Sequence, residues 1–168
     1  MGKLIIVNGT MGVGKTSVCE KLNETLSNSV FLDGDWCWKM SPFTVTDETK
    51  KMVINNISFL LNSYINCSAF EHIVFCWVLH KDTIIEELIS RLDQSDCELH
   101  VITLVCSEES LRSRMQNDVE MQLRDEGSIE RSIERLPLYH LMDTQKIDVS
   151  ALSVDMTVEK IERIIRSK

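Results

Sequence analysis

The sequence predicts an α/β fold in which a parallel sheet is covered by helices on both faces. Short apolar runs typical of buried strands alternate along the chain with segments of helical periodicity, so successive strands are joined by helices. The first strand runs through a glycine-rich loop directly into a helix. A length of 168 residues, with 43% hydrophobic and 26% charged side chains, fits a single globular domain over residues 1–168.

The glycine-rich loop is the most specific motif in the chain. Gly9–Thr16 fills the phosphate-binding pattern G-x-x-x-x-G-K-[ST] at every fixed position. The apolar run Leu4–Val7 precedes it, as expected of a strand that is buried on both faces. Apolar residues then recur at helical spacing along Lys15–Ser27. This context of strand and helix argues against a chance match to an ordinary glycine turn.

The residue types of this loop suit the binding of a nucleoside triphosphate. Gly9, Gly12 and Gly14 lack a Cβ atom, so the loop can turn tightly and direct N–H groups at an anion. A helix that opens at Lys15 adds free N–H groups. The lysine ammonium would contact the β- and γ-phosphates, and the Thr16 hydroxyl would ligate Mg²⁺. We therefore expect ATP to be bound by Gly9, Thr10, Met11, Gly12, Val13, Gly14, Lys15, Thr16 and Ser17.

Two aspartates follow the second predicted strand. Val30–Leu32 runs into Asp33 and Asp35, and ligands bind at the carboxyl edge of a parallel sheet. Phosphoryl transfer needs one carboxylate that holds the metal and one that orients the acceptor. The alternative is that Asp-Gly marks an ordinary turn. We favour the functional interpretation for both aspartates and expect Thr16 and Asp33 to hold the metal.

Aromatic side chains gather beside the predicted acceptor site. Trp36 and Trp38 follow the aspartates, and the third predicted strand, Ile73–Leu79, contains Trp77 and ends at His80. If the second and third strands lie side by side, these residues form a wall that could stack on a base or another flat ring. The alternative is a hydrophobic plug. His80 is the weaker candidate for a general base, because a histidine at a strand end is commonly structural.

The other predicted elements continue the alternation of strands and helices. Pro42 precedes a long helix that starts at Asp47, and Thr83–Glu86 has the pattern of a capping box at the start of another helix. The remaining elements are a strand at Leu99–Val105, a helix capped by Ser107, a strand at Lys146–Ser150 and a terminal helix with apolar residues at Val158, Ile161 and Ile165.

Residues from about 118 to 138 differ in composition from the rest of the chain. Apolar spacing thins and charges crowd in, so we predict a small mobile lid rather than core. Arg124, Arg131 and Arg135 lie there, and a planar guanidinium suits the neutralisation of transferred charge. The alternative is that each arginine is a solvated charge beside a neighbouring glutamate. We take Arg124 as the first choice of catalytic arginine and place Arg131 with it.

The composition limits the partners and the compartment. A net charge of −8 argues against nonspecific binding to nucleic acid or to an anionic membrane. The six cysteines form no C-x-x-C pair, which fits free thiols in a reducing cytosol. We find no secretory leader, no myristoylation pattern and no apolar stretch long enough to span a membrane. We therefore expect a cytoplasmic protein.

These motifs resemble those of the P-loop small-molecule and nucleotide kinases, the group that contains shikimate, gluconate and nucleoside monophosphate kinases. The resemblance rests on Gly9–Thr16, on Asp33-x-Asp35 after the second strand and on Leu111-x-x-Arg114 after the fourth. An arginine-bearing lid and a short strand before a final helix extend it over essentially the whole chain. It implies the three-layer P-loop NTPase fold, with a five-stranded parallel sheet of order 2-3-1-4-5.

The resemblance also implies a role for the motif residues. Members of this group move the γ-phosphoryl of ATP to an acceptor hydroxyl or phosphate. By analogy, Asp33 would hold Mg²⁺ through water, and Asp35 would contact the acceptor and take its proton. Arg114 would lie against the adenine, and a lid arginine would close over the γ-phosphate.

The chain departs from this resemblance near the acceptor. Nucleoside monophosphate kinases often carry an aspartate at the end of the third strand, where Cys76, Trp77 and His80 stand here. We expect a kinase that uses ATP and Mg²⁺ to phosphorylate a nucleotide or nucleoside-like metabolite, as a monomer or homodimer. The alternatives are a sugar-like or antibiotic hydroxyl as acceptor, or a nucleotide-binding accessory protein with little transferase activity.

Two related functions are rejected. Gln145–Asp148 resembles the guanine-binding motif Asn-Lys-x-Asp, but no apolar strand precedes it. A polynucleotide kinase is disfavoured because the chain offers no evident basic track for a strand of nucleic acid.

Overall fold

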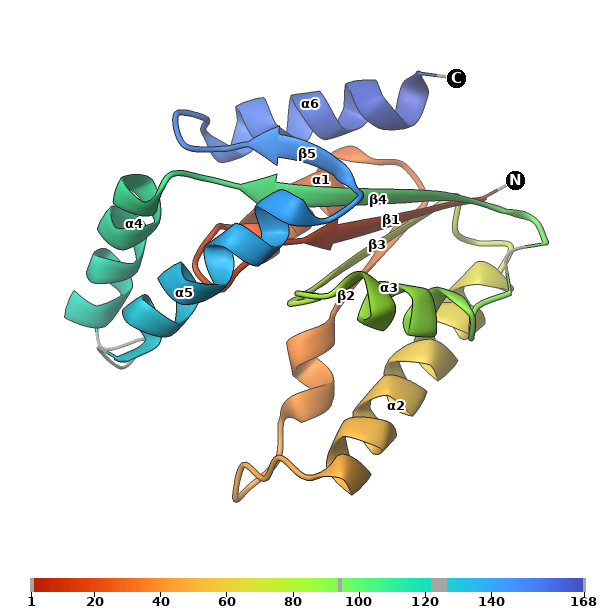
Figure 1. Ribbon diagram of the computed structural model, residues 1–168. Helices are drawn as coiled ribbons and strands as arrows, with labels where there is room; N and C mark the ends of the chain where they lie inside the picture. The colour runs from red at the N-terminus through yellow and green to blue at the C-terminus, as the bar shows by residue number, and fades with distance from the viewer. Residues whose placement is uncertain (1, 94, 122–126, 168) are drawn as a thin grey trace.

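A computed structural model describes residues 2–93, 95–121 and 127–167 of the chain (Figure 1). Its strands form one five-stranded sheet in which all neighbours are parallel. The order β2-β3-β1-β4-β5 confirms the predicted order 2-3-1-4-5. The strands are β1 (Gly2–Asn8), β2 (Ser29–Asp33), β3 (His72–Trp77), β4 (Cys97–Val105) and β5 (Gln145–Asp148).

Helices join the strands, and a short 3₁₀ helix, η1, follows β2. In the view of Figure 1, α6 lies above the sheet, and α2 and α3 lie below it. The helical segments are α1 (Lys15–Thr25), η1 (Gly34–Trp38), α2 (Asp47–Ile65), α3 (Asp82–Ile89), α4 (Glu108–Glu120), α5 (Gly127–Leu141) and α6 (Val154–Arg166).

The sheet has a hydrophobic core on each face, because successive side chains of a strand point to opposite sides. In β1, Ile5 and Val7 pack into the core with α1, α4 and α6, whereas Leu4 and Ile6 pack into the core with α2 and α3. All four side chains are buried. This is the predicted arrangement of a sheet covered by helices on both faces.

The register of the strands gathers the predicted site residues at one edge. Asn8, the last residue of β1, lies opposite Trp77 of β3, and Asp33 at the end of β2 lies opposite Cys76. The phosphate-binding loop leaves the sheet after Asn8. The central strand β1 therefore delivers this loop beside the carboxyl ends of β3 and β2.

One local prediction, that of a helix start, is wrong. The capping box expected at Thr83–Glu86 is absent, because α3 begins at Asp82 after Lys81, which makes no side-chain cap hydrogen bond. A capping box occurs instead at the start of α2, where Thr46 and Thr49 exchange side-chain and backbone hydrogen bonds.

The segment from 118 to 138 is also not separate from the core over the part that the structure describes. Residues 127–138 belong to α5, in which Ile129 and Leu136 are buried and join the core that α1 and α4 share. The proposed motion of this segment stays a prediction.

Candidate active site

The phosphate-binding loop has the backbone of an anion-binding turn. It joins β1 to α1, and Gly9, Gly12 and Gly14 have φ values of +149°, +82° and +105°. Gly14 also precedes the first turn of α1, which carries no side-chain cap. The free N–H groups of that turn, together with the positive end of the helix dipole, face whatever the loop binds.

Lys15 lies within this loop, as predicted. It is half-buried, and its Nζ donates a hydrogen bond to the Thr10 carbonyl oxygen at 2.9 Å. Burial lowers the pKa of Lys15, because the charged ammonium loses water. Asp33 and Asp35 partly oppose this shift. Lys15 lines one cavity together with both carboxylates, at the place where phosphates would need its charge.

The two predicted aspartates lie together through hydrogen bonds. The Thr16 hydroxyl donates to Asp33 Oδ2 at 2.8 Å, and the Asp35 N–H donates to Asp33 Oδ1 at 2.9 Å. Asp33 is buried, whereas Asp35 is exposed. Gly34 between them has no room for a side chain, because a Cβ atom there would lie 2.5 Å from Cγ of Trp77. A glycine between the two aspartates is therefore required by the close approach of Trp77 at the end of β3.

A cavity of about 300 Å³ opens over the loop. Arg114 lies in its wall and donates hydrogen bonds to the carbonyl oxygens of Val13 and Val149, so α4 is tied to the loop and to the end of β5. Contact of Arg114 with adenine stays a prediction. The cavity is lined by Met11, Gly12, Gly14, Lys15, Thr16, Ser17, Asp33, Asp35, Val78, Arg114 and Asp118.

A larger cavity of about 1050 Å³ lies next to the first. The two share Met11, Asp35 and Val78 in their walls, so they meet beside the Asp35 carboxylate. The remaining lining residues come from η1 and the loop after it, from the end of β3 and the loop after it, from α2, from α3 and the turn after it, and from α5. These are Trp38, Phe43, Val45, Asp47, Lys50, Lys51, Ile54, Trp77, His80, Ile84, Glu87, Arg91 and Arg135.

The structure separates the three candidate arginines. Both described arginines are exposed, but Arg135 lines the larger cavity, whereas Arg131, one turn earlier on α5, lines neither of the two cavities. Arg124, the first choice from the sequence, lies outside the described residues. Arg135 is therefore the arginine that the described geometry brings to the site.

His80 lines the same cavity as Arg135. Burial lowers the pKa of His80, and the charge of Arg135 adds to the effect.

The aromatic wall is only partly as expected. Trp38, Trp77 and His80 line the larger cavity, but Trp36 does not: its ring packs edge-on against Phe31, with centroids 5.3 Å apart. Phe43, whose ring lies 5.8 Å from that of Trp38, takes its place.

The basic residues of the larger cavity could not be assigned to the site from the sequence. Lys50 and Lys51 lie on α2 and Arg91 lies in the turn after α3, and no motif connects these segments to the phosphate-binding loop. On α2 the lining residues recur at helical spacing from Asp47 to Ile54. That spacing indicates that these residues share one side of α2, but it does not indicate which other element or cavity lies opposite them.

Residues 5–135, which include the loop, both aspartates and Arg135, match the model of the AAA domain. The chain belongs to the AAA domain family. No match was found among the curated proteins.

Solved structures share the fold of this AAA domain. A tunicamycin resistance protein from Deinococcus radiodurans is 17% identical, with a TM-score of 0.67 over 100% of this chain and 98% of that one. A gluconokinase from Sinorhizobium meliloti is 20% identical, with a TM-score of 0.66 over 97% and 93%. A sugar kinase from Janibacter is 13% identical, with a TM-score of 0.70 over 98% and 95%. The fold is thus that of the P-loop small-molecule kinases.

The side chains of the AAA domain fit a magnesium ion at the junction of Thr16 and Asp33. Their oxygens lie 2.8 Å apart in the wall of the smaller cavity, and hard oxygen ligands are those that Mg²⁺ prefers. Over the described ranges, no three His, Cys, Asp or Glu side chains are grouped so that they could hold a metal by themselves. An ion here would complete its shell with water and phosphate oxygens, as Mg²⁺ usually does.

Helix α5 is fastened directly to the phosphate-binding loop. The buried Thr10 hydroxyl donates to the Ser132 carbonyl oxygen at 2.9 Å. Below it, the buried Asn8 amide bonds both backbone groups of Leu79 at 2.8 Å, and its nitrogen lies 3.3 Å from the sulfur of Met142. The loop, the end of β3 and α5 therefore form one connected unit.

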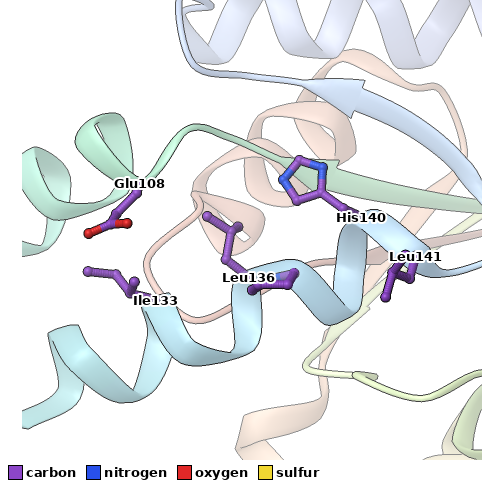
Figure 2. A pocket seen from close by; sticks show the side chains of 6 residues that line it. Glu108, Ile133, Leu136, His140 and Leu141 are labelled. Carbon is purple, nitrogen blue, oxygen red and sulfur yellow. The ribbon is translucent and has the colours of Figure 1, made fainter.

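A further cavity of about 340 Å³ lies between the start of α4 and one side of α5. Figure 2 shows Glu108 on one side, with Ile133 and Leu136 facing it from α5. It shares no lining residue with the other two cavities.

In the described part of the chain, no helix is both long and apolar enough to cross a membrane.

Proposed function

We propose that this protein is an ATP-dependent kinase that transfers the γ-phosphoryl group to a small-molecule acceptor. The observation that carries the proposal is the junction of the two cavities at Asp35. One cavity is built around a phosphate-binding loop, and the other has the volume for a second molecule, since pockets for small ligands commonly measure about 300–1,000 Å³. A phosphoryl donor and an acceptor would thus meet beside a carboxylate.

Each residue of the junction has a part in this reaction. The loop N–H groups and Lys15 hold the β- and γ-phosphates, and Asp35 takes the proton of the acceptor hydroxyl. The acceptor oxygen forms a bond to the γ-phosphorus as the bond to the β,γ-bridging oxygen breaks, and ADP leaves. Mg²⁺ at Thr16 and Asp33 would supply charge neutralisation on the phosphate oxygens. Arg135 is our choice for the cation on the acceptor side.

We favour a nucleotide or nucleoside-like acceptor, because Trp38, Phe43 and Trp77 supply flat apolar surface in the larger cavity. A sugar-like or antibiotic hydroxyl is the second candidate. It is supported by the likeness in fold to a gluconokinase, a sugar kinase and a tunicamycin resistance protein. Asp35 at the junction suits a hydroxyl in either case. We place the protein in the cytoplasm, since its six cysteines are free.

The competing function is a nucleotide-binding accessory protein with little transferase activity. It would use the same loop and would need no acceptor. The two functions differ in one measurable quantity: whether any acceptor accelerates the formation of ADP from ATP and Mg²⁺.

The test is an ADP-release assay with nucleosides, nucleoside monophosphates, polyols and tunicamycin as candidate acceptors. Phosphorylated product should form with at least one of them. Lys15→Ala should lower kcat/KM by about 100-fold or more, the loss seen when one charge-stabilising donor is removed from a site. Lys21→Ala, on the exposed side of α1, is the matched control and should leave turnover unchanged. ATP binding without transfer to any acceptor would favour the accessory function, and full activity of Lys15→Ala would refute the site.

A further inference from the structure

The larger cavity holds more basic than acidic side chains. Its charged lining residues are Asp35, Asp47, Glu87, Lys50, Lys51, Arg91 and Arg135. Two of the cations are already paired inside the cavity wall. Lys50 Nζ lies 3.3 Å from Asp47 Oδ1 on α2, and Arg91 lies 2.7 Å from Glu87 on α3.

Lys51 and Arg135 remain without such partners. Within residues 2–93, 95–121 and 127–167, neither makes a hydrogen bond or an ion pair with another side chain or with the backbone. They come from different helices, α2 and α5. The protein as a whole has a net charge of −8, so a cavity with two unpaired cations differs in the sign of its charge from the rest of the molecule.

Lys51 and Arg135 are themselves exposed, so any reduction in the screening of their charges comes from the cavity walls. Trp38, Trp77 and Ile54 are half-buried or buried and exclude water from part of the space. A charge acts over a longer range when less water screens it. His80 does not add a further cation near neutral pH, because burial and the charge of Arg135 hold its pKa below the usual value.

We propose that the larger cavity selects an acceptor that carries a negatively charged group, bound by Lys51 and Arg135, over a neutral molecule of the same shape. The acceptor class is then a ring-bearing hydroxyl compound with a phosphate or carboxylate substituent. The aromatic side chains receive the ring, the guanidinium fork of Arg135 suits two oxygens of the anion, and Lys51 supplies a point charge. That the bound molecule is a phosphoryl acceptor rests on the proposed function, but the charge preference itself does not.

The charge preference can be measured without knowing the acceptor. Two of the three tryptophans, Trp38 and Trp77, line the cavity, so Trp36→Phe leaves only these reporters. The quenching of their fluorescence by iodide and by caesium is measured at equal ionic strength, and each is divided by the quenching of free N-acetyltryptophanamide by the same ion. On this scale iodide, an anion, should quench at least about twice as strongly as caesium, because a cationic wall concentrates anions. Equal relative quenching, or stronger relative quenching by caesium, would overturn the inference.

Variants locate the effect. In the Trp36→Phe protein, Lys51→Met and Arg135→Met should each lower the ratio of iodide to caesium quenching by about half, since each removes one of two local cations. Lys160→Met, on the exposed face of α6, removes the same charge elsewhere and should leave the ratio unchanged. A ratio that falls equally in all three variants would show a general effect of net charge and refute the cavity site.

The substrate class is tested by matched acceptors. Adenosine and AMP, cytidine and CMP, and glucose and glucuronate keep the same ring within each pair and differ in charge. The anionic member should have the higher kcat/KM in at least one pair, and Lys51→Met should reduce that advantage about tenfold, which is about 1.4 kcal/mol. If the neutral member always reacts faster, the inference fails while the kinase stands. If nothing is phosphorylated but iodide quenches selectively, the kinase fails and the anion site stands.

Discussion

Gly12 occupies the most crowded position in the phosphate-binding loop. A Cβ atom there would lie 2.4 Å from Cγ of Met115, and the residue has a φ of +82°. Gly14 offers a natural comparison, because its φ is +105° but a methyl group added there would have no neighbouring atom within 4 Å. The two positions separate the strain of the backbone from the collision with a neighbouring side chain.

We predict that Gly12→Ala destabilises the protein more than Gly14→Ala. Backbone strain at positive φ costs on the order of 1–3 kcal/mol for either substitution. Gly12→Ala adds the displacement of Met115, which is fully buried, and so should also weaken ATP binding by moving α4 against the loop. Urea denaturation and ATP titration measure the two effects.

A double variant controls this interpretation. Met115→Ala alone should cost about 2–5 kcal/mol as a core truncation. Combined with Gly12→Ala it should cost less than the sum, because the space that the methyl group needs is then empty. Strict additivity would mean that the collision with Met115 does not matter.

At the scale of elements, the link between the loop and α5 helps to position one wall of the larger cavity. Thr10 donates to the carbonyl of Ser132, three residues before Arg135. The position of Arg135 in the larger cavity therefore depends on a hydrogen bond from the loop that binds phosphates. Any change in the loop on nucleotide binding has a direct route to this arginine.

We predict that Thr10→Val loosens α5 without unfolding the protein. Valine keeps the shape but removes the donor, which should lower the free energy of unfolding by about 1 kcal/mol. Amide hydrogen exchange across residues 127–141 should speed up by about fivefold, the factor that 1 kcal/mol represents. Thr25→Val, whose hydroxyl bonds only within α1, should leave α5 exchange as it is. Unchanged exchange in Thr10→Val would show that the core contacts of α5 suffice to hold it.

Elements whose cause is local could be predicted from the sequence. The glycine pattern, the unbroken apolar runs and the aspartates after β2 each indicate their structure within a few residues. The sequence predictions are wrong where polar residues are buried, because burial was inferred from apolar residues. In α5 the buried positions include Ser128 and Ser132, and the Ser132 hydroxyl bonds to the Ser128 carbonyl oxygen. These serines interrupt the apolar stripe, so the sequence of the segment is typical of an exposed helix.

The larger cavity could not be predicted for a different reason. Its wall is assembled from faces of α2, α3 and α5, and Lys51 and Arg135 are 84 positions apart in the sequence. Nothing local relates them. Only the packing of the helices against the sheet brings both into one cavity. Trp38 and Trp77 could be paired in advance, because Trp38 lies shortly after β2 and Trp77 is the last residue of the adjacent strand β3.

At the scale of the whole molecule, two half-buried histidines link stability to pH. Burial lowers the pKa of His80, with Arg135 and Lys81 adding to the shift. Burial also lowers the pKa of His100, with Glu98 opposing and Lys3 assisting. As the pH falls through 6.5, the usual value, the unfolded chain takes up protons that the folded protein resists.

The sign of the effect follows from this proton balance. Stability is complete above pH 6.5 and is lost as the pH falls toward the lowered values, because the unfolded state then binds more protons. A second loss should begin near pH 3.8, where Asp148 keeps its charge through hydrogen bonds from Ser150. The two ranges are separate enough to be assigned to different residues.

We therefore predict that the melting temperature falls by a few degrees between pH 7 and pH 5, and that His80→Gln combined with His100→Gln removes most of this decline. Glutamine fills similar space and cannot take up a proton, so the folded and unfolded states of the variant bind equal numbers of protons at these positions. His140→Gln, at an exposed site on α5, should retain the wild-type profile. Calorimetric scans across this range measure all three proteins, and a double variant that still loses stability as the wild type does would assign the decline to other groups.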